Sequence, residues 1–244
     1  MKIDARDVYY RQLNALIRKA AAEGEKEFEL DNINGQRYLG TGVEGDVKII
    51  VNGVPGNDMG IFMNGPTIIV NASAQDSIAN TMNEGKIVIH GNAGDVLAYA
   101  MRGGKLFIKG DVGYRVGIHM KSYKKQIPKV VVGGTAQDFF GEYMAGGILV
   151  LLGLDKAPEQ PLVGDYVGTG MHGGVIYIRG EVQAEQLGKE VAAQELNEAD
   201  QQELAELLQE YCQDLGLDCE EIMKEKFIKL VPVSNRPYGR LYAY

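Results

Sequence analysis

Residues 85–104 read GKIVIHGNAGDVLAYAMRGG: an alternating apolar segment, a run of small residues, a second apolar segment and a methionine. The same arrangement recurs along most of the chain. Four successive methionines are spaced 19 residues apart, and two more follow at 24 and 27, which fits the same unit with insertions. These methionines are Met63, Met82, Met101, Met120, Met144 and Met171. A repeat of this length is typical of a solenoid, in which each unit packs on its neighbours.

Glycine recurs in three columns of the repeat, ten, seven and three positions before the methionines, and the last of these columns holds only glycine and alanine. The resulting pattern G-xx-G-xxx-G is complete in two units. Glycine suits points where a coil turns a corner or where two backbones approach closely. We therefore assign a structural role to Gly53, Gly56, Gly60, Gly91, Gly94, Gly110, Gly113, Gly117, Gly164 and Gly168.

A strand follows each methionine, because aliphatic residues alternate there with a period of two. One inward column begins at Ile68, Ile87 and Leu106, and a second lies two residues further on. Each unit is too short for a strand plus a crossover helix. The sequence therefore predicts an all-β fold, a single-stranded right-handed parallel β-helix of six to seven coils over residues 28–182.

The segments on either side of the repeat are predicted to cover its ends. Residues 1–27 contain an expected capping helix over 4–23, with Asp4 as its N-cap and Leu13, Leu16 and Ile17 on its apolar face. Residues 183–244 contain an expected helix over 197–215 and an extended tail from Phe227 to Tyr244.

One column is apolar although it must point away from the interior. It lies between the two inward positions of each strand and comprises Ile50, Ile69, Val88, Phe107, Val131, Val150 and Tyr177. An apolar ladder of this size should be covered. Two interpretations stay open: a terminal helix or the tail of this chain lies over it, or it is an interface with a second copy or a partner.

Composition excludes several functional classes. The chain has 244 residues, a net charge of −8 and a pI near 5.0, which argues against a nucleic-acid partner. The only two cysteines, Cys212 and Cys219, form no metal-binding pattern. Neither a signal peptide nor a membrane span is indicated, so a cytoplasmic location is expected.

For each motif, a structural role explains the residues better than a functional one. The GxGxxG matches at Gly40 and Gly168 lead into predicted strands, whereas a dinucleotide site needs a following helix. The three histidines fall in different columns, and no serine lies in a nucleophile elbow. A column of Asp76, Asp95, Asp138 and Asp165 suits turns and capping better than acid–base work. We assign no catalytic, cofactor-binding or metal-binding residue.

Several segments resemble a known family, the GXGXG domain found at the C-terminus of the glutamate synthase large subunit. They are NGQRYLGTG (34–42), NTMNEGKIVIHGNAGD (80–95), YAMRGGKLFIKGDVGYRVGIHMK (99–121), GEYMAGG (141–147) and GTGMHGGVIYIRG (168–180). The resemblance covers about residues 28–182, and the flanking segments look like those of free-standing versions of the domain. A similar β-helix occurs in the C subunit of formylmethanofuran dehydrogenase.

The resemblance implies a role in glutamine-dependent glutamate synthesis. In that family the β-helix holds no catalytic group and orients the catalytic domains, while FMN and an iron–sulfur cluster lie in the synthase domain. We therefore expect a non-catalytic structural subunit of a split glutamate synthase, with no cofactor of its own. Its expected partners are amidotransferase-type and FMN-dependent synthase subunits, and self-association is possible.

Two alternatives remain. The chain could be the β-helix subunit of a formylmethanofuran-dehydrogenase-like complex. It could also be an independent esterase, in which case Ser77, Ser122 or His119 would be essential for activity.

Overall fold

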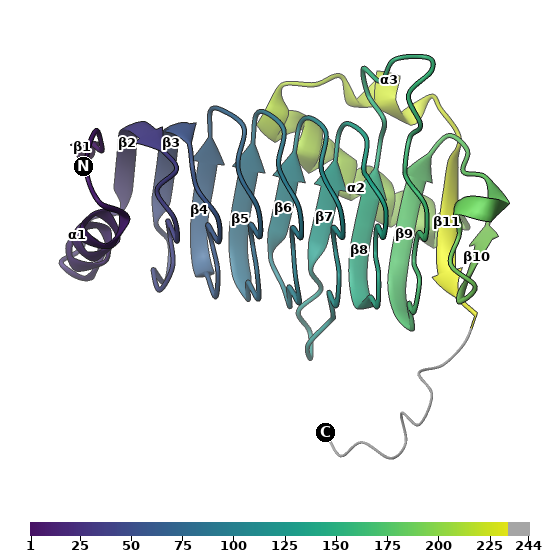
Figure 1. Ribbon diagram of the computed structural model, residues 1–244. Helices are drawn as coiled ribbons and strands as arrows, with labels where there is room; N and C mark the ends of the chain where they lie inside the picture. Colours follow the sequence, from purple (N-terminus) through teal and green to yellow (C-terminus); the bar gives the residue numbers. More distant parts are fainter. Residues whose placement is uncertain (234–244) are drawn as a thin grey trace.

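A computed structural model describes residues 1–233 as a parallel β-solenoid of about six turns, with one helix at its N-terminal end and further helices along one side (Figure 1). The helices are α1 (Tyr10–Ala22), α2 (Glu198–Leu215) and α3 (Cys219–Met223). The strands are β1 (Lys2–Asp4), β2 (Glu27–Asn34), β3 (Lys48–Val54), β4 (Asn64–Val70), β5 (Glu84–Ile89), β6 (Lys105–Ile108), β7 (Lys129–Val132), β8 (Ala145–Leu151), β9 (Gly173–Arg179), β10 (Val191–Gln194) and β11 (Phe227–Pro232).

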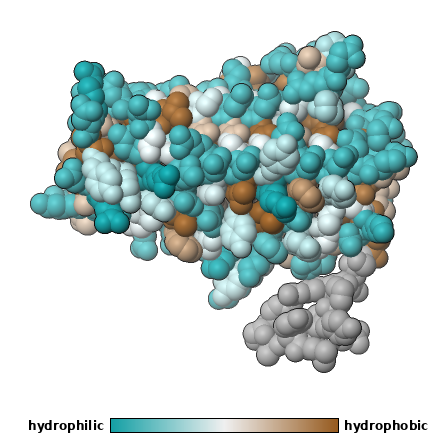
Figure 2. All heavy atoms as spheres, in the orientation of Figure 1, coloured by the Kyte–Doolittle hydropathy of each residue, from teal (hydrophilic) through white to brown (hydrophobic). Residues whose placement is uncertain are grey.

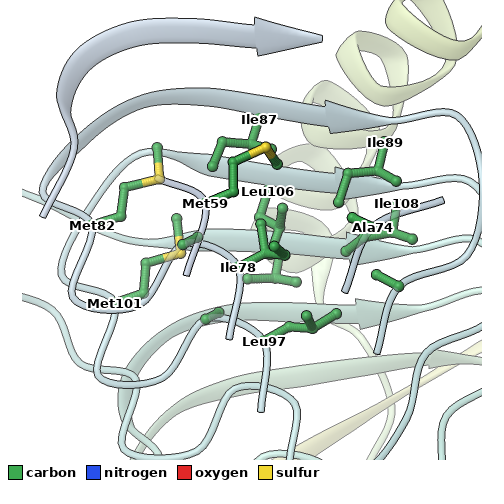
Figure 3. Packing of buried hydrophobic residues seen from close by; sticks show 14 of the residues in the cluster. Met59, Ala74, Ile78, Met82, Ile87, Ile89, Leu97, Met101, Leu106 and Ile108 are labelled. Carbon is green, nitrogen blue, oxygen red and sulfur yellow. The ribbon is translucent and has the colours of Figure 1, made fainter. Parts of the chain in front are cut away.

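The strands β1 to β9 lie side by side in sequence order and all pair in parallel. The register confirms the predicted columns across both insertions: Leu106 pairs with Val130, and Leu149 with Ile176. Every residue of the two inward columns is fully buried. Figure 3 shows neighbouring coils placing like residues together, with Ile87 near Leu106 and Ile89 near Ile108. The predicted β-helix is therefore confirmed as a parallel solenoid.

The methionine column lies inside the solenoid and packs against glycines of the next coil. All six methionines of the repeat are fully buried in one hydrophobic cluster. The methyl group of Met63 lies against Gly85, and that of Met82 lies against Gly104. Each flexible thioether therefore fills the space that a missing side chain leaves one coil further on.

A second segment of each coil is ordered without being a β-strand. In the unit that ends at Met101, Val96, Ala98 and Ala100 have left-handed φ values of 59°, 56° and 49°. The N–H groups of Val96 and Ala100 donate to the next coil, and that of Ala98 donates to the preceding coil, at 2.8–2.9 Å. Bonds to both neighbours thus hold a conformation that residues with a Cβ normally avoid.

The N-terminal end differs from the sequence expectation. The helix begins at Tyr10 rather than Asp4, and residues 2–4 instead add the parallel strand β1 to β2, with Ile3 paired to Leu30. Backbone bonding to the open sheet edge outweighs helix formation there. Leu13 and Ile17 of α1 are buried as expected, whereas Leu16 is 40% exposed. The predicted helix 4–23 was therefore too long at its start.

The C-terminal end is covered by strands that run the other way. β11 pairs antiparallel with β9, and β10 pairs antiparallel with β11. Part of the segment expected to be an extended tail is therefore a sheet strand, Phe227–Pro232. The rest of that expected tail, 234–244, lies outside the described residues.

The left-handed segment yields a stability prediction. Val96 is β-branched and half-buried at φ 59°, a conformation that asparagine tolerates far better. Val96→Asn should raise the free energy of unfolding by about 1 kcal/mol, measured by urea titration. The matched control is Val175→Asn in β9, where the valine has ordinary strand geometry and asparagine should destabilise. A Val96→Asn protein no more stable than wild type would contradict the argument.

Candidate functional site

Ladders of polar side chains join successive coils beside the glycine columns. Asp76 Oδ1 accepts a hydrogen bond from the Asp95 N–H at 3.0 Å, and Asp95 Oδ1 accepts one from the Tyr114 N–H at 2.9 Å. Asp138 Oδ1 bonds to the Asp165 N–H in the same way, at 3.0 Å. The aspartates that could have been read as stacked acid–base groups therefore satisfy the backbone of the next coil.

These ladders explain why the repeat needs its glycines. A Cβ on Gly94 would lie well inside 3.0 Å of Asp76 Oδ1, and one on Gly113 would collide with Asp95 Oδ1. A Cβ on any of the other eight would also lie within 3.0 Å of a neighbouring heavy atom: Gly53, Gly56, Gly60, Gly91, Gly110, Gly117, Gly164 and Gly168. Gly60, Gly117 and Gly168 combine this crowding with left-handed φ values. Close approach between coils, more than corner geometry alone, accounts for the pattern.

The apolar ladder on the outer face is covered by α2 of this chain. Val88, Phe107, Val131, Val150 and Tyr177 are buried in one cluster with the apolar stripe of that helix. The Phe107 and Tyr211 rings meet edge to face with centroids 5.6 Å apart, and the Tyr211 hydroxyl donates to the Ile108 carbonyl at 3.0 Å. Five members of the ladder are therefore unavailable to a partner. Only its start, at Ile50 and Ile69, stays half-buried outside this cluster.

The helix lies across the strands and is fixed at both ends by ion pairs. Lys229 Nζ contacts Asp200 Oδ1 at 2.5 Å and the Tyr177 hydroxyl donates to the same oxygen at 3.1 Å, so this end lies over β9. Lys86 Nζ contacts Asp214 Oδ2 at 2.7 Å, so the other end lies over β5. Asp214 lies 14 positions after Asp200, a separation that spans about 21 Å of helix. Four strand spacings span about 19 Å, so the helix matches the distance from β5 to β9.

The contacts around Asp200 shift the pKa values of two acidic groups, Asp200 and Tyr177. Burial would raise the pKa of Asp200, but the Lys229 ammonium, the Asn197 N–H and the Tyr177 hydroxyl outweigh it and hold that pKa below its usual value. Burial and the neighbouring Asp200 carboxylate raise the pKa of Tyr177. Asp200 also completes a capping box with Asn197, the N-cap of α2. The cluster therefore depends on an ionised Asp200.

A row of aromatic side chains on the left-handed segments is exposed, and sequence reasoning missed it. We call Tyr99, His119, Phe139, Tyr143 and Tyr166 the aromatic flank. His119 stacks on Tyr143 with centroids 5.3 Å apart and meets Tyr99 edge-on at 5.8 Å, while Phe139 stacks on Tyr166 at 5.0 Å. Tyr99, Tyr143 and Tyr166 are 38%, 45% and 54% exposed. Stacking at the coil spacing holds these rings rigidly at the surface.

A cation lies over one of the two stacks of the aromatic flank. The Arg115 guanidinium lies 4.3 Å from the centroid of the Phe139 ring and forms an ion pair with the buried carboxylate of Glu142. Aromatic residues and arginine are the types that dominate binding energy at protein interfaces. The signal in the sequence was the recurrence of aromatic residues at fixed positions of the repeat: His119 and Tyr143 lie one position before a methionine, and Phe139 and Tyr166 lie five positions before one. Tyr99 lies two positions before Met101 and falls in neither column.

The remaining sequence candidates are not brought together. Among the described residues, His119 has aromatic partners rather than a serine, and His172 Nδ1 lies 3.1 Å from the Gly170 carbonyl. The GxGxxG segments that start at Gly40 and Gly168 lead into β3 and β9, as expected. Residues 1–233 contain no cluster of His, Cys, Asp and Glu that could hold a metal ion. In the same range, no helix is long and apolar enough to cross a membrane.

An open cleft of about 1030 Å³ lies at the N-terminal end, between residues 6–10 and the ends of β2 and β3. Its polar side chains largely bond to one another or to the backbone. Asn52 Nδ2 donates to Asp31 Oδ1 at 2.7 Å, and Gln36 Nε2 donates to the Ala5 carbonyl at 2.9 Å. The side chains of Asn52 and Gln36 are therefore engaged within the protein. The space-filling view shows hydrophobic side chains scattered between hydrophilic ones along the molecule (Figure 2).

Comparison with known proteins identifies a family with the same glycine motif and a solved structure with a similar fold. A family model described as "GXGXG motif" matches residues 27–233. An uncharacterised protein of Methanocaldococcus jannaschii is 46% identical over 248 aligned residues, which cover 98% of this chain and 95% of the relative. A chain in the crystal structure of the formyltransferase/hydrolase complex from Methylorubrum extorquens with methylofuran has a similar fold. That likeness has a TM-score of 0.60 at 20% identity and covers 91% of this chain and 87% of the other.

The glycine columns predict a measurable coupling. Gly94→Ala should lower the free energy of unfolding by about 2 kcal/mol, because the new methyl group displaces the Asp76 carboxylate from its bond to the next coil. In an Asp76→Ala background the same change should cost about 1 kcal/mol less, since the colliding oxygen is gone. Urea titrations of the four proteins give the coupling energy. If the effects of the two substitutions were additive, the Asp76 carboxylate would not be the reason that position 94 requires glycine.

Asp200 predicts an acid-dependent stability. Because the folded-state pKa lies below the unfolded value of 3.8, its stabilisation is present above that value and is lost as the pH falls through the folded pKa. Asp200→Asn should therefore cost about 1 kcal/mol or more near pH 7, and the deficit should shrink between about pH 5 and about pH 3.

Urea titrations across this pH range measure the effect, and Glu198→Gln, an exposed acid in the same helical turn, is the control. A deficit of Asp200→Asn that stays constant with pH would contradict the assignment.

Proposed function

The chain belongs to the GXGXG motif family, and from that premise we propose that it is a non-catalytic structural subunit of a split glutamate synthase. In this role it orients an amidotransferase-type subunit and an FMN-dependent synthase subunit for glutamine-dependent glutamate synthesis. FMN and the iron–sulfur cluster then belong to the partners. The aromatic flank carries the proposal, because a rigid row of exposed rings on a solenoid is suited to holding other chains.

The construction of the solenoid supports a positioning role. Coil-to-coil hydrogen bonds run along both the strands and the left-handed segments, so neighbouring coils are tied together on more than one side. Helix α2 braces the strands from β5 to β9 through ion pairs at both of its ends. Fixed separation of two active sites favours transfer of a small intermediate such as ammonia without loss to solvent.

The likeness to a chain of the formyltransferase/hydrolase complex favours a second candidate. In that alternative the chain is the β-helix subunit of a formylmethanofuran-dehydrogenase-like complex. The physical task is the same, since a rigid solenoid again positions catalytic chains. Only the identity of those chains differs.

Affinity purification of the tagged chain from its native host, followed by mass spectrometry, tests the proposal. We expect an amidotransferase-type chain and a flavoprotein synthase to co-purify at a constant ratio through a second purification step. Recovery of formyltransferase or hydrolase chains would support the second candidate instead. Recovery of the chain alone, under gentle lysis and at low salt, would refute both.

Activity of the recovered complex provides a sharper measurement. After this chain is depleted, formation of glutamate from 2-oxoglutarate should fall at least about tenfold with glutamine as the nitrogen donor, because ammonia transfer needs the fixed geometry. The rate with added ammonium, which bypasses the transfer, should change much less. Equal loss with both donors would indicate a different role, and re-addition of the purified chain is the control.

A further inference from the structure

An inserted segment gives the chain a charged projection that the solenoid itself does not need. The unit that ends at Met120 is followed by an insertion of five residues before the next strand, and residues 121–127, which include the insertion, form a hairpin that we call the basic hairpin. Figure 1 shows this connection into β7 reaching beyond the lower rim of its neighbours. The basic hairpin contains Lys121, Lys124 and Lys125 and no acidic residue, in a chain of net charge −8.

The basic hairpin is held in a defined shape. Tyr123 and Gln126 exchange backbone hydrogen bonds at 3.0 and 2.9 Å, which places Lys124 and Lys125 at the tip. The Gln126 amide donates to the Asn83 carbonyl, two coils earlier, at 3.1 Å. The Lys124 ammonium lies 5.2 Å from the centroid of the Tyr123 ring. The tip charges are therefore presented on an anchored support.

The side chains of the basic hairpin face solvent. Tyr123 is 49% exposed and Ile127 is 46% exposed, while Lys121, Lys124 and Lys125 are also exposed. His119, in the aromatic flank, precedes Ser122 by three residues, so the two features lie within about 10 Å along the chain. A tyrosine and an isoleucine beside lysines, next to stacked rings, combine apolar contact area with a local positive charge.

We propose that the basic hairpin and the adjacent His119–Tyr143 stack form one docking surface for the acidic face of a partner protein subunit. The proposal rests on the proposed function, because it names where one partner of the complex binds. Charge complementarity identifies the occupant. The three lysines project from an acidic chain, so they attract an acidic partner surface while keeping it away from most of the acidic residues of this chain. The exposed Tyr123 and Ile127 supply the apolar centre that such an interface needs.

The test uses the full chain and the partner that co-purifies with it. Lys124→Glu/Lys125→Glu should weaken binding of the purified partner at least about tenfold, mainly through slower association, while thermal unfolding stays unchanged because both side chains are exposed. Lys156→Glu/Lys189→Glu is the matched control, with the same change in net charge at exposed lysines elsewhere, and it should bind like wild type. Raising NaCl from about 50 to about 300 mM should slow association of the wild type more than that of the hairpin variant.

Hydrogen exchange gives an independent readout, since amides 122–127 should exchange more slowly in the complex than in the free chain. Equal affinity of the hairpin variant and the control in a complex that still assembles would overturn the docking proposal and leave the proposed function intact. Failure to recover any complex would overturn both. Hairpin-dependent self-association by sedimentation, or hairpin-dependent binding of duplex DNA or phosphatidylserine vesicles at about 150 mM NaCl without a protein partner, would also overturn it.

Discussion

The structure depends on one constraint: each coil lies directly against the next at the spacing of hydrogen-bonded strands, about 4.8 Å. At that distance a residue mainly meets the equivalent residue of its neighbours. Aliphatic columns fill the interior, and aspartate oxygens reach the backbone of the next coil. The glycines follow from the same constraint, because an atom of a neighbouring segment, most often an oxygen or a backbone atom, already occupies the volume of their absent side chains.

Columns of the repeat were predictable from the sequence because stacking makes like residues recur. The spacing of Met63, Met82 and Met101 was enough to derive the register, which the pairing of β4 to β9 confirms. The start of α1 was not predictable from local signals, because Asp4 resembles a helix cap. Pairing of residues 2–4 with the sheet edge is a long-range interaction that no local pattern reveals.

The surface features were harder to derive than the interior. The outward ladder could be identified, yet only the structure shows that the helix with Tyr211 and Asp200 covers most of it. The aromatic flank was missed because its residues differ in type from coil to coil, so that His119 and Tyr143 form a stack that no single-residue pattern marks. The residue types at these outer positions vary from coil to coil because the stacking of the coils does not fix them.

The matched length of α2 also limits how this molecule can evolve. A duplication of one 19-residue unit between β5 and β9 would add a strand spacing that the helix cannot span, and it would separate Lys86 from Asp214 or Lys229 from Asp200. Extra units inserted before β5 would meet no such obstacle. Gain and loss of repeats among homologues should therefore concentrate in the N-terminal coils, because the length of α2 fixes the number of coils between β5 and β9.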